Sequence, residues 1–121
     1  MKYALLIHER QEDFDLRTDP VSGPAYWAGW AAFSQAVAEA GIMTGGAGLQ
    51  APDTATTVRV GGGDDAVQDG PFVESKEMLG GLYIIDVPSI DEALKWAARV
   101  PVFPGRHIEV RPVIVVMPEQ A

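Results

Sequence analysis

The sequence contains no cysteine and no asparagine. The absence of cysteine excludes disulfide bonds, thiolate nucleophiles and cysteine metal ligands, and the absence of asparagine excludes N-glycosylation. Basic residues are also scarce: nine lysines and arginines stand against seventeen aspartates and glutamates, which gives a formal net charge of -8 at pH 7. A surface of this sign repels a phosphate backbone, so we expect no nucleic-acid partner.

Long apolar runs are absent as well, since none approaches the ~18 residues that a membrane-spanning helix needs. The apolar run at residues 1–8 is followed by Glu9 and Arg10 without a small-residue cleavage pattern, which is typical of a strand rather than of a signal peptide. We therefore expect a cytoplasmic protein with no membrane contact. The length of 121 residues and the 47% hydrophobic content predict a single globular domain over residues 1–121.

Hydrophobic periodicity and turn residues divide the chain into strands and helices. Pro24 near the start and Gly41 after the end delimit a first helix, and Ser89 with Glu92 forms the capping box of a second. The pattern predicts, in order, a strand over 1–8, a long loop over 10–21, a helix over 24–40, a strand over 42–49, a hairpin over 54–68, a strand over 82–87, a helix over 90–100 and a strand over 108–117.

This order is that of the ferredoxin-like fold, an α+β architecture of βαββαβ type, here with an inserted hairpin. Its two helices cover one face of an antiparallel sheet. The strands over 1–8 and 82–87 are apolar on both alternating sets, which indicates that the other face is covered too. We expect the cover to be the same face of a second copy, in a homodimer with facing sheets.

Four stretches of the chain resemble the YCII-related family, in its subgroup marked by the DGPF motif. They are, in chain order, MKYALLI, DGPFVESKE, LGGLYIIDVPSIDEALKWAARVP and IEVRPV. The resemblance implies a ferredoxin-like domain that pairs as a dimeric α/β barrel. It implies little chemistry, because members are mostly uncharacterised; a few relatives are linked to dechlorination of aromatic catabolites, and some lie fused to or beside extracytoplasmic-function sigma factors.

The first helix departs from one feature of that family. The shorter YCII proteins resemble enzymes with a His and Asp pair, whose histidine lies in the first helix. Here residues 25–33 read AYWAGWAAF, so this helix has no histidine to supply that pair.

The DGPF motif itself is open to a structural interpretation. Asp69 can bond the backbone two residues on, Gly70 supplies an unusual φ, and Pro71 fixes the next φ. On this interpretation Asp69 locks the exit of the hairpin and Phe72 fills the core. A related alternative is that the stretch only builds the dimer.

The DGPF stretch also has a functional interpretation. Asp69, Glu74, Lys76 and Glu77 would line a cleft, where a lysine beside carboxylates can tune proton transfer. Loops held by rigid strands are the usual place for such groups.

A second candidate cluster follows from the pairing of the first and last strands. Antiparallel pairing brings His8 close to Glu109 and Arg111, either as a site or as a rim network of ion pairs. Because we expect the DGPF stretch to enter its strand at the opposite end of the sheet, the two clusters should lie apart within one subunit. The two histidines lack metal-ligand spacing and the glycine runs lack a phosphate-loop context, so we expect no metal and no cofactor.

Aromatic residues of the helices offer binding surfaces. Trp30 and Phe33 share the apolar stripe of the first helix and are expected in the core. Trp27 and Trp96 lie off their helices' stripes and are better candidates for a ligand or an interface.

Together these features predict a small-molecule-binding protein with a pocket between sheet and helices. A further hypothesis is an enzyme that uses general acid/base chemistry on a small aromatic or carbonyl compound. The alternative is a non-catalytic binding or regulatory module associated with an extracytoplasmic-function sigma factor. The candidate catalytic residues are Asp69, Lys76, Glu77 and His8, and the candidate binding residues are Phe72, Glu74, Arg111, Glu109 and Trp27.

Overall fold

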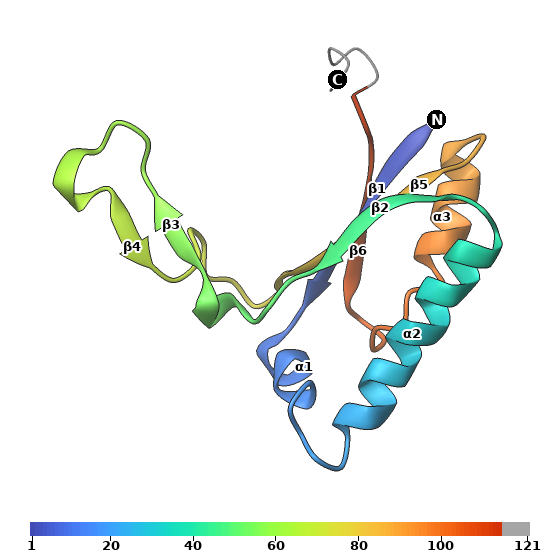
Figure 1. The fold of residues 1–121 in the computed structure, drawn as a ribbon, viewed down its shortest axis with the longest axis horizontal. Coiled ribbons are helices and arrows are strands. Elements are labelled where there is room, and N and C mark those ends of the chain that lie inside the picture. The colour runs from blue at the N-terminus through green and yellow to red at the C-terminus, as the bar shows by residue number, and fades with distance from the viewer. Residues whose placement is uncertain (115–121) are drawn as a thin grey trace.

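A four-stranded antiparallel sheet with helices on one face forms the body of the protein (Figure 1). A computed structural model describes residues 1–114. The strand order is β2-β5-β1-β6, which is the ferredoxin-like order predicted from the sequence. The sheet and its covering helices are β1 (Lys2–Glu9), α2 (Gly23–Glu39), β2 (Met43–Gly48), β5 (Met78–Asp86), α3 (Ile90–Ala97) and β6 (His107–Pro112).

The core lies between the sheet and the two helices. Tyr3, Leu5 and Ile7 alternate along β1 and are all buried on the helical side. Phe33 and Val37 of α2 pack against them in one buried cluster. The alternation that predicted a strand therefore also fixes which face of β1 meets α2.

The helix ends agree with the predicted signals. Pro24 occupies the first turn of α2, and Gly41 follows its end with a φ of +70°, a left-handed conformation that glycine adopts without strain. The Ser89 hydroxyl accepts a hydrogen bond of 3.3 Å from the backbone N–H of Glu92 and so caps α3. Among the described residues, no helix is both long and apolar enough to span a membrane.

The predicted loop over residues 10–21 is wrong in part, because it contains the short helix α1 (Gln11–Leu16). The Asp13 carboxylate accepts a hydrogen bond of 2.9 Å from the backbone N–H of Arg10 and so caps the first turn. Arg106, far along the chain, donates two hydrogen bonds of 2.8 Å to the same carboxylate. Long-range pairing rather than an apolar stripe therefore holds this helix in place.

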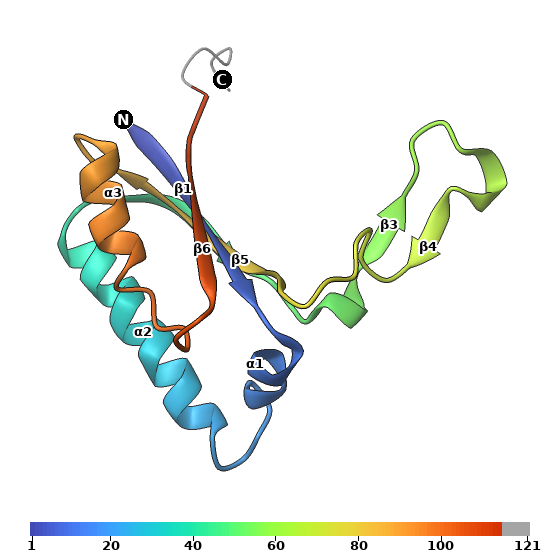
Figure 2. The ribbon, with the colours of Figure 1, turned by 180° about the vertical axis from the view of Figure 1, so that it is seen from behind.

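The inserted hairpin forms a two-stranded sheet of its own, as predicted. Its strands are β3 (Thr56–Val58) and β4 (Val67–Asp69), with the 3-10 turns η1 (Pro52–Thr54) and η2 (Gly63–Asp65) beside them. Figures 1 and 2 show this hairpin projecting away from the body.

Strand β5 begins earlier than predicted and contains two adjacent glycines. A Cβ atom on Gly80 would lie 2.6 Å from the Glu9 carboxylate, and one on Gly81 would lie 3.0 Å from the Ala47 carbonyl. Both glycines are therefore needed for close packing inside the strand. At the other end of the chain, β6 matches the predicted last strand up to Pro112. The prediction is wrong for residues 113–114, which are not in a strand, and its part over 115–117 lies outside the described residues.

The sheet face opposite the helices carries apolar side chains. Ala4 and Leu6 of β1 pair with Ile84 and Leu82 of β5, and all four are half-buried although no helix of the described chain covers them (Figure 2). The second copy that was expected to cover this face stays a prediction.

Candidate functional site

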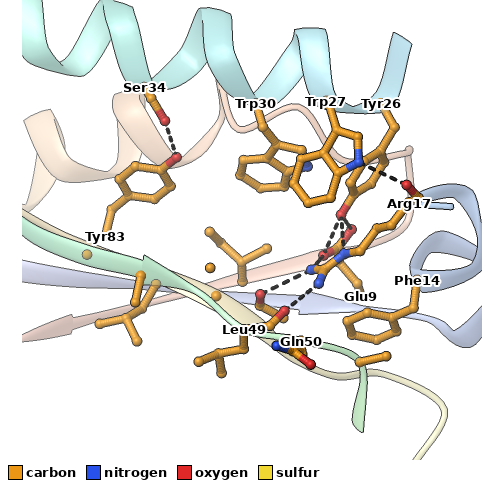
Figure 3. A pocket seen from close by; sticks show the side chains of 18 of the residues that line it. Glu9, Phe14, Arg17, Tyr26, Trp27, Trp30, Ser34, Leu49, Gln50 and Tyr83 are labelled. Carbon is orange, nitrogen blue, oxygen red and sulfur yellow. Dashed lines mark hydrogen bonds and ion pairs between the residues drawn. The ribbon is translucent and has the colours of Figure 1, made fainter. Parts of the chain in front are cut away.

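A cavity of about 980 Å³ lies between α2, the β2/β5 side of the sheet and the turn that joins α1 to α2. This is the predicted place, between sheet and helices. Figure 3 shows Tyr26, Trp27, Trp30 and Ser34 descending from α2 toward the sheet. The α2 side of the wall is thus largely aromatic, and the remaining lining residues include both apolar and polar groups.

Glu9 supplies the buried charge of this cavity. It is the last residue of β1, on the same side as the core residues, and is 2% exposed. The Tyr26 hydroxyl donates to both Glu9 carboxylate oxygens, at 2.8 and 3.0 Å, and Arg17 Nη2 donates at 3.3 Å. These donors satisfy a carboxylate that would be costly to bury alone.

Burial, together with the neighbouring Glu9 carboxylate, raises the pKa of Tyr26 to about 12 against the opposing effect of the hydrogen bond from Arg17. The phenol therefore keeps its proton at neutral pH. It acts as a fixed hydrogen-bond donor to Glu9 rather than as a source of a proton.

Arg17 joins three segments at the cavity wall. Besides Glu9, its guanidinium donates to the Tyr26 hydroxyl at 3.2 Å, to the Gly80 carbonyl at 3.2 Å and to the Leu49 carbonyl. Its backbone carbonyl accepts a hydrogen bond of 3.0 Å from Trp27 Nε1. Arg17 thus neutralises the buried carboxylate and holds the turn after α1 against β2 and β5.

A second polar position lies at the other end of the cavity. The Ser34 and Tyr83 hydroxyl oxygens are 2.5 Å apart, so one hydroxyl donates to the other (Figure 3). The accepting hydroxyl keeps its own hydrogen for a ligand acceptor. Trp30 Nε1, also on this wall, is enclosed and has no hydrogen-bond partner within residues 1–114.

Among the predicted aromatic candidates, Trp27 lines the cavity and is 49% exposed. Phe33 is buried as predicted, whereas Trp30 is partly buried and forms cavity wall as well as core. Trp96 packs against the core. The Arg99 guanidinium carbon lies over the Trp96 ring, 4.3 Å from the ring centroid.

Asp69, Phe72 and Glu74 lie on the projecting hairpin and the turn after it, and all three are exposed. Phe72 is 85% exposed, so the expectation that it fills the core is wrong: the turn stands away from the body. The hairpin exit is closed by the Gly70 backbone, which bonds Ala55 and the Thr57 hydroxyl at 2.7 Å each, and not by the Asp69 side chain. None of the three predicted residues lines the large cavity.

Glu77 lies at the body of the protein, where β5 begins. Its carboxylate lies 2.9 Å from His107 Nδ1 and accepts a backbone hydrogen bond of 3.2 Å from the same residue. The hydrogen bond from the His107 side chain lowers the pKa of Glu77 below its ordinary value. Lys76 lies beside Glu77 and lines a second, smaller cleft of about 450 Å³.

The second predicted cluster is brought together as expected. His8 Nε2 lies 3.5 Å from one Glu109 carboxylate oxygen, and Arg111 Nε donates to the other at 2.6 Å. The network lies on the sheet face opposite the helices, as the strand alternation requires, and away from the large cavity.

The expectation that the two clusters lie at opposite ends of the sheet is wrong. Strands β1 and β5 are antiparallel neighbours, so the end of β1 lies beside the start of β5, with His8 opposite Leu79. His8 also pairs in register with His107, the partner of Glu77. The catalytic and binding roles assigned to these residues stay predictions.

The polar residues that define the two ends of the cavity were not among the candidate catalytic and binding residues predicted from the sequence; they are Glu9, Arg17, Tyr26, Ser34 and Tyr83. Glu9 had a signal, since it continues the inward alternation of β1 as a charged residue in an apolar series. Arg17 had none, because its partners lie up to 63 residues away in the chain. Within residues 1–114, no three acidic or histidine side chains are grouped so that they could hold a metal ion.

Comparison with known proteins matches residues 1–117 to the YCII-related domain. A stretch of 59 residues is 48% identical to "Uncharacterized protein R00369" of Rhizobium meliloti (strain 1021). The matched stretch covers 49% of this chain and 48% of that protein, so the similarity spans about half the length of the relative. With the ferredoxin-like strand order and a domain match over nearly its whole length, the chain belongs to the YCII-related family.

Proposed function

We propose that this protein binds a small, flat organic molecule in the cavity beneath α2. The observation that carries the proposal is a space of about 980 Å³ whose wall includes five aromatic side chains. A buried carboxylate, Glu9, and the Ser34 and Tyr83 hydroxyl pair lie at its two ends, and further polar residues line it around Arg17, Gln50 and Asp53. Such cavities, mainly apolar with a few placed polar groups, are the usual sites of small ligands.

The polar positions favour a ligand with a hydrogen-bond donor at one end and an acceptor at the other. Glu9 can accept more hydrogen bonds than Tyr26 and Arg17 supply, since the single Tyr26 hydroxyl hydrogen is shared between the two carboxylate oxygens. The Ser34 and Tyr83 pair has one hydrogen to donate. A small aromatic or carbonyl compound that carries a hydroxyl group satisfies both ends.

Acid/base chemistry, if this ligand is turned over, falls to Glu9. It is the buried carboxylate of the cavity, whereas Asp69 and His8 lie outside it. Tyr26 retains its proton and serves to orient Glu9.

The binding proposal predicts that 4-hydroxyacetophenone, which has a phenol and a carbonyl group, raises the melting temperature of the protein. Tyr83→Phe should weaken this probe about fivefold, because one hydrogen bond is lost while ring shape is kept. Trp27→Ala should weaken it about tenfold through the loss of an aromatic wall. Thermal shift at several probe concentrations measures the change.

Trp96→Phe is the matched control, since Trp96 is an aromatic residue of the other helix and does not line the cavity. It should leave the probe affinity unchanged. A probe response that is equal in the wild type, Tyr83→Phe and Trp27→Ala would contradict the proposed site.

The homodimer is a second proposal, which rests on the uncovered sheet face. This face carries an apolar patch that consists of Ala4, Leu6, Leu82 and Ile84. Two copies of the patch can pack against each other about a two-fold axis, because the same surface serves both partners. We expect a dimer at micromolar concentration in sedimentation equilibrium. Leu6→Glu should give a monomer, because two carboxylates would meet at the centre of the interface.

Leu94→Glu is the control for this experiment, since Leu94 is 50% exposed on α3, on the opposite side of the sheet. It should leave the dimer intact. A wild-type protein that sediments as a monomer would contradict the proposal. The sigma-factor partner and the cytoplasmic location stay predictions.

A further inference from the structure

We propose that Arg10 and Lys76 form a binding site for the carboxylate of a small organic acid. The site is the second cleft, of about 450 Å³, where the start of α1 meets the segment that leads into β5. It shares Gln11 and Phe14 with the wall of the larger cavity, but its basic residues are not part of that cavity, and the proposal does not depend on the proposed function. Lys76 brings the last part of the DGPF stretch into the cleft.

Arg10 is the unusual group of this cleft. Its side chain is 28% exposed, and its Nε is enclosed without a hydrogen-bond partner in the described part of the chain. Its terminal nitrogens approach Glu12 at 3.9 Å and Glu77 at 4.0 Å, which are beyond hydrogen-bond length. A partly buried guanidinium with its donors unused is costly, and a bound anion would remove that cost.

The other arginines with largely buried side chains differ from Arg10 in the number of hydrogen bonds that they donate. Arg17 donates four hydrogen bonds, and Arg106 donates three to two carboxylates. Most N–H donors of these two guanidinium groups are therefore used, whereas Arg10 has no hydrogen bond from its guanidinium within residues 1–114.

Nearby carboxylates are engaged with other partners. Glu12 accepts from Arg106 at 3.1 Å, and Glu77 lies 2.9 Å from His107. Lys76 has no ion pair with any residue between 1 and 114 and lines the cleft beside Arg10. Two of the nine basic residues of an acidic chain thus share one cleft, and within residues 1–114 neither has a carboxylate at hydrogen-bond distance.

The rest of the lining indicates the class of anion. It combines three apolar side chains, Phe14, Pro52 and Met78, with the polar Gln11, Glu12 and Ser75. The apolar surface suits a carbon skeleton more than an inorganic ion. The planar fork of a guanidinium matches a carboxylate with two parallel hydrogen bonds, and the lysine adds a point charge. These features together favour a small organic acid.

Benzoate is the probe for this site, and benzamide is its uncharged analogue of nearly equal shape. Titration of the full chain, followed by amide signals in two-dimensional NMR at constant ionic strength, should show benzoate shifting residues 10–12 and 75–78. Benzamide should leave these signals in place. Lys76→Gln should weaken benzoate about tenfold, because one of two charge-assisted contacts is lost.

Lys95→Gln is the matched control, because Lys95 is 74% exposed on α3 and, among residues 1–114, pairs only with Glu92, at 3.3 Å. It should leave benzoate affinity unchanged. If both substitutions weakened benzoate binding equally, the change in net charge would explain the effect, and the proposed site would be overturned. Shifts confined to residues around Trp27 and Tyr83 would place benzoate in the other cavity, and inorganic phosphate of equal affinity would overturn the organic-acid assignment.

Discussion

Arg17→Met should lower the free energy of unfolding by about 3–5 kcal/mol, the usual loss when one partner of a buried ion pair is removed. The Glu9 side chain is 3% exposed and that of Arg17 13% exposed, so the carboxylate would remain in the interior without its counter-charge. The same change removes the hydrogen bonds to Leu49 and Gly80 that hold the cavity wall. Urea unfolding measures the loss, and the thermal response to 4-hydroxyacetophenone should disappear with it.

Arg99→Met is the control for charge and length. Arg99 is exposed and stacks on Trp96 at 4.3 Å, a contact worth about 0.5–1 kcal/mol at such a place. In the double variant Glu9→Gln with Arg17→Met, the second substitution should cost less than it does alone, because no charge is left unpaired. If Arg17→Met cost no more than Arg99→Met, the ion pair would not stabilise this site.

Asp13→Ala should lower the free energy of unfolding by about 3 kcal/mol, again because a buried ion pair loses one partner. Asp13 is 2% exposed, accepts two hydrogen bonds from Arg106 and caps the first turn of α1. The loss should appear in urea unfolding together with increased amide exchange over residues 11–16. Asp15→Ala, an exposed change on the same helix, should remain within about 0.5 kcal/mol of the wild type.

The contribution of Asp13 should also depend on pH. Burial alone raises the pKa of Asp13, but the hydrogen bonds from Arg106 and from the Arg10 backbone, with the charges of both arginines, lower it below the ordinary value. A lowered pKa in the folded state means that the stabilisation is complete above the pKa of the unfolded chain, about 4. It is lost as the pH falls through the lower folded-state pKa. The difference between the wild type and Asp13→Ala should therefore be constant near neutral pH and shrink below about pH 4.

The elements that could be predicted from the sequence are those with local signals. The alternation of Tyr3, Leu5 and Ile7 specifies β1, and Ser89 caps α3 through a residue three positions away. Helix α1 escaped prediction because Asp13 is held by Arg106, which lies 93 residues further along the chain. A pattern within a short stretch of sequence cannot reveal a partner so far along the chain.

The candidate site could be predicted only in part, because some of its residues have local signals and others depend on distant partners. Its position between sheet and helices followed from the fold, and Trp27 followed from its place off the apolar stripe of α2. The DGPF stretch was a candidate because it contains several ionisable side chains, but most of its side chains are exposed. The cavity instead uses Glu9 and Arg17, whose importance depends on contacts between distant segments.

The projecting hairpin leaves and rejoins the body at two points that are already neighbours. Gly48 at the end of β2 pairs with Gly81 of β5, and the Leu49 N–H donates to the Gly80 carbonyl at 2.9 Å. Residues 50–77 are therefore a detour between two strands that the sheet itself holds side by side. The part of the detour that lines neither cavity, residues 55–74, can change in length or sequence without altering the strand order. It is therefore free to acquire new contacts while the cavity beneath α2 keeps its frame.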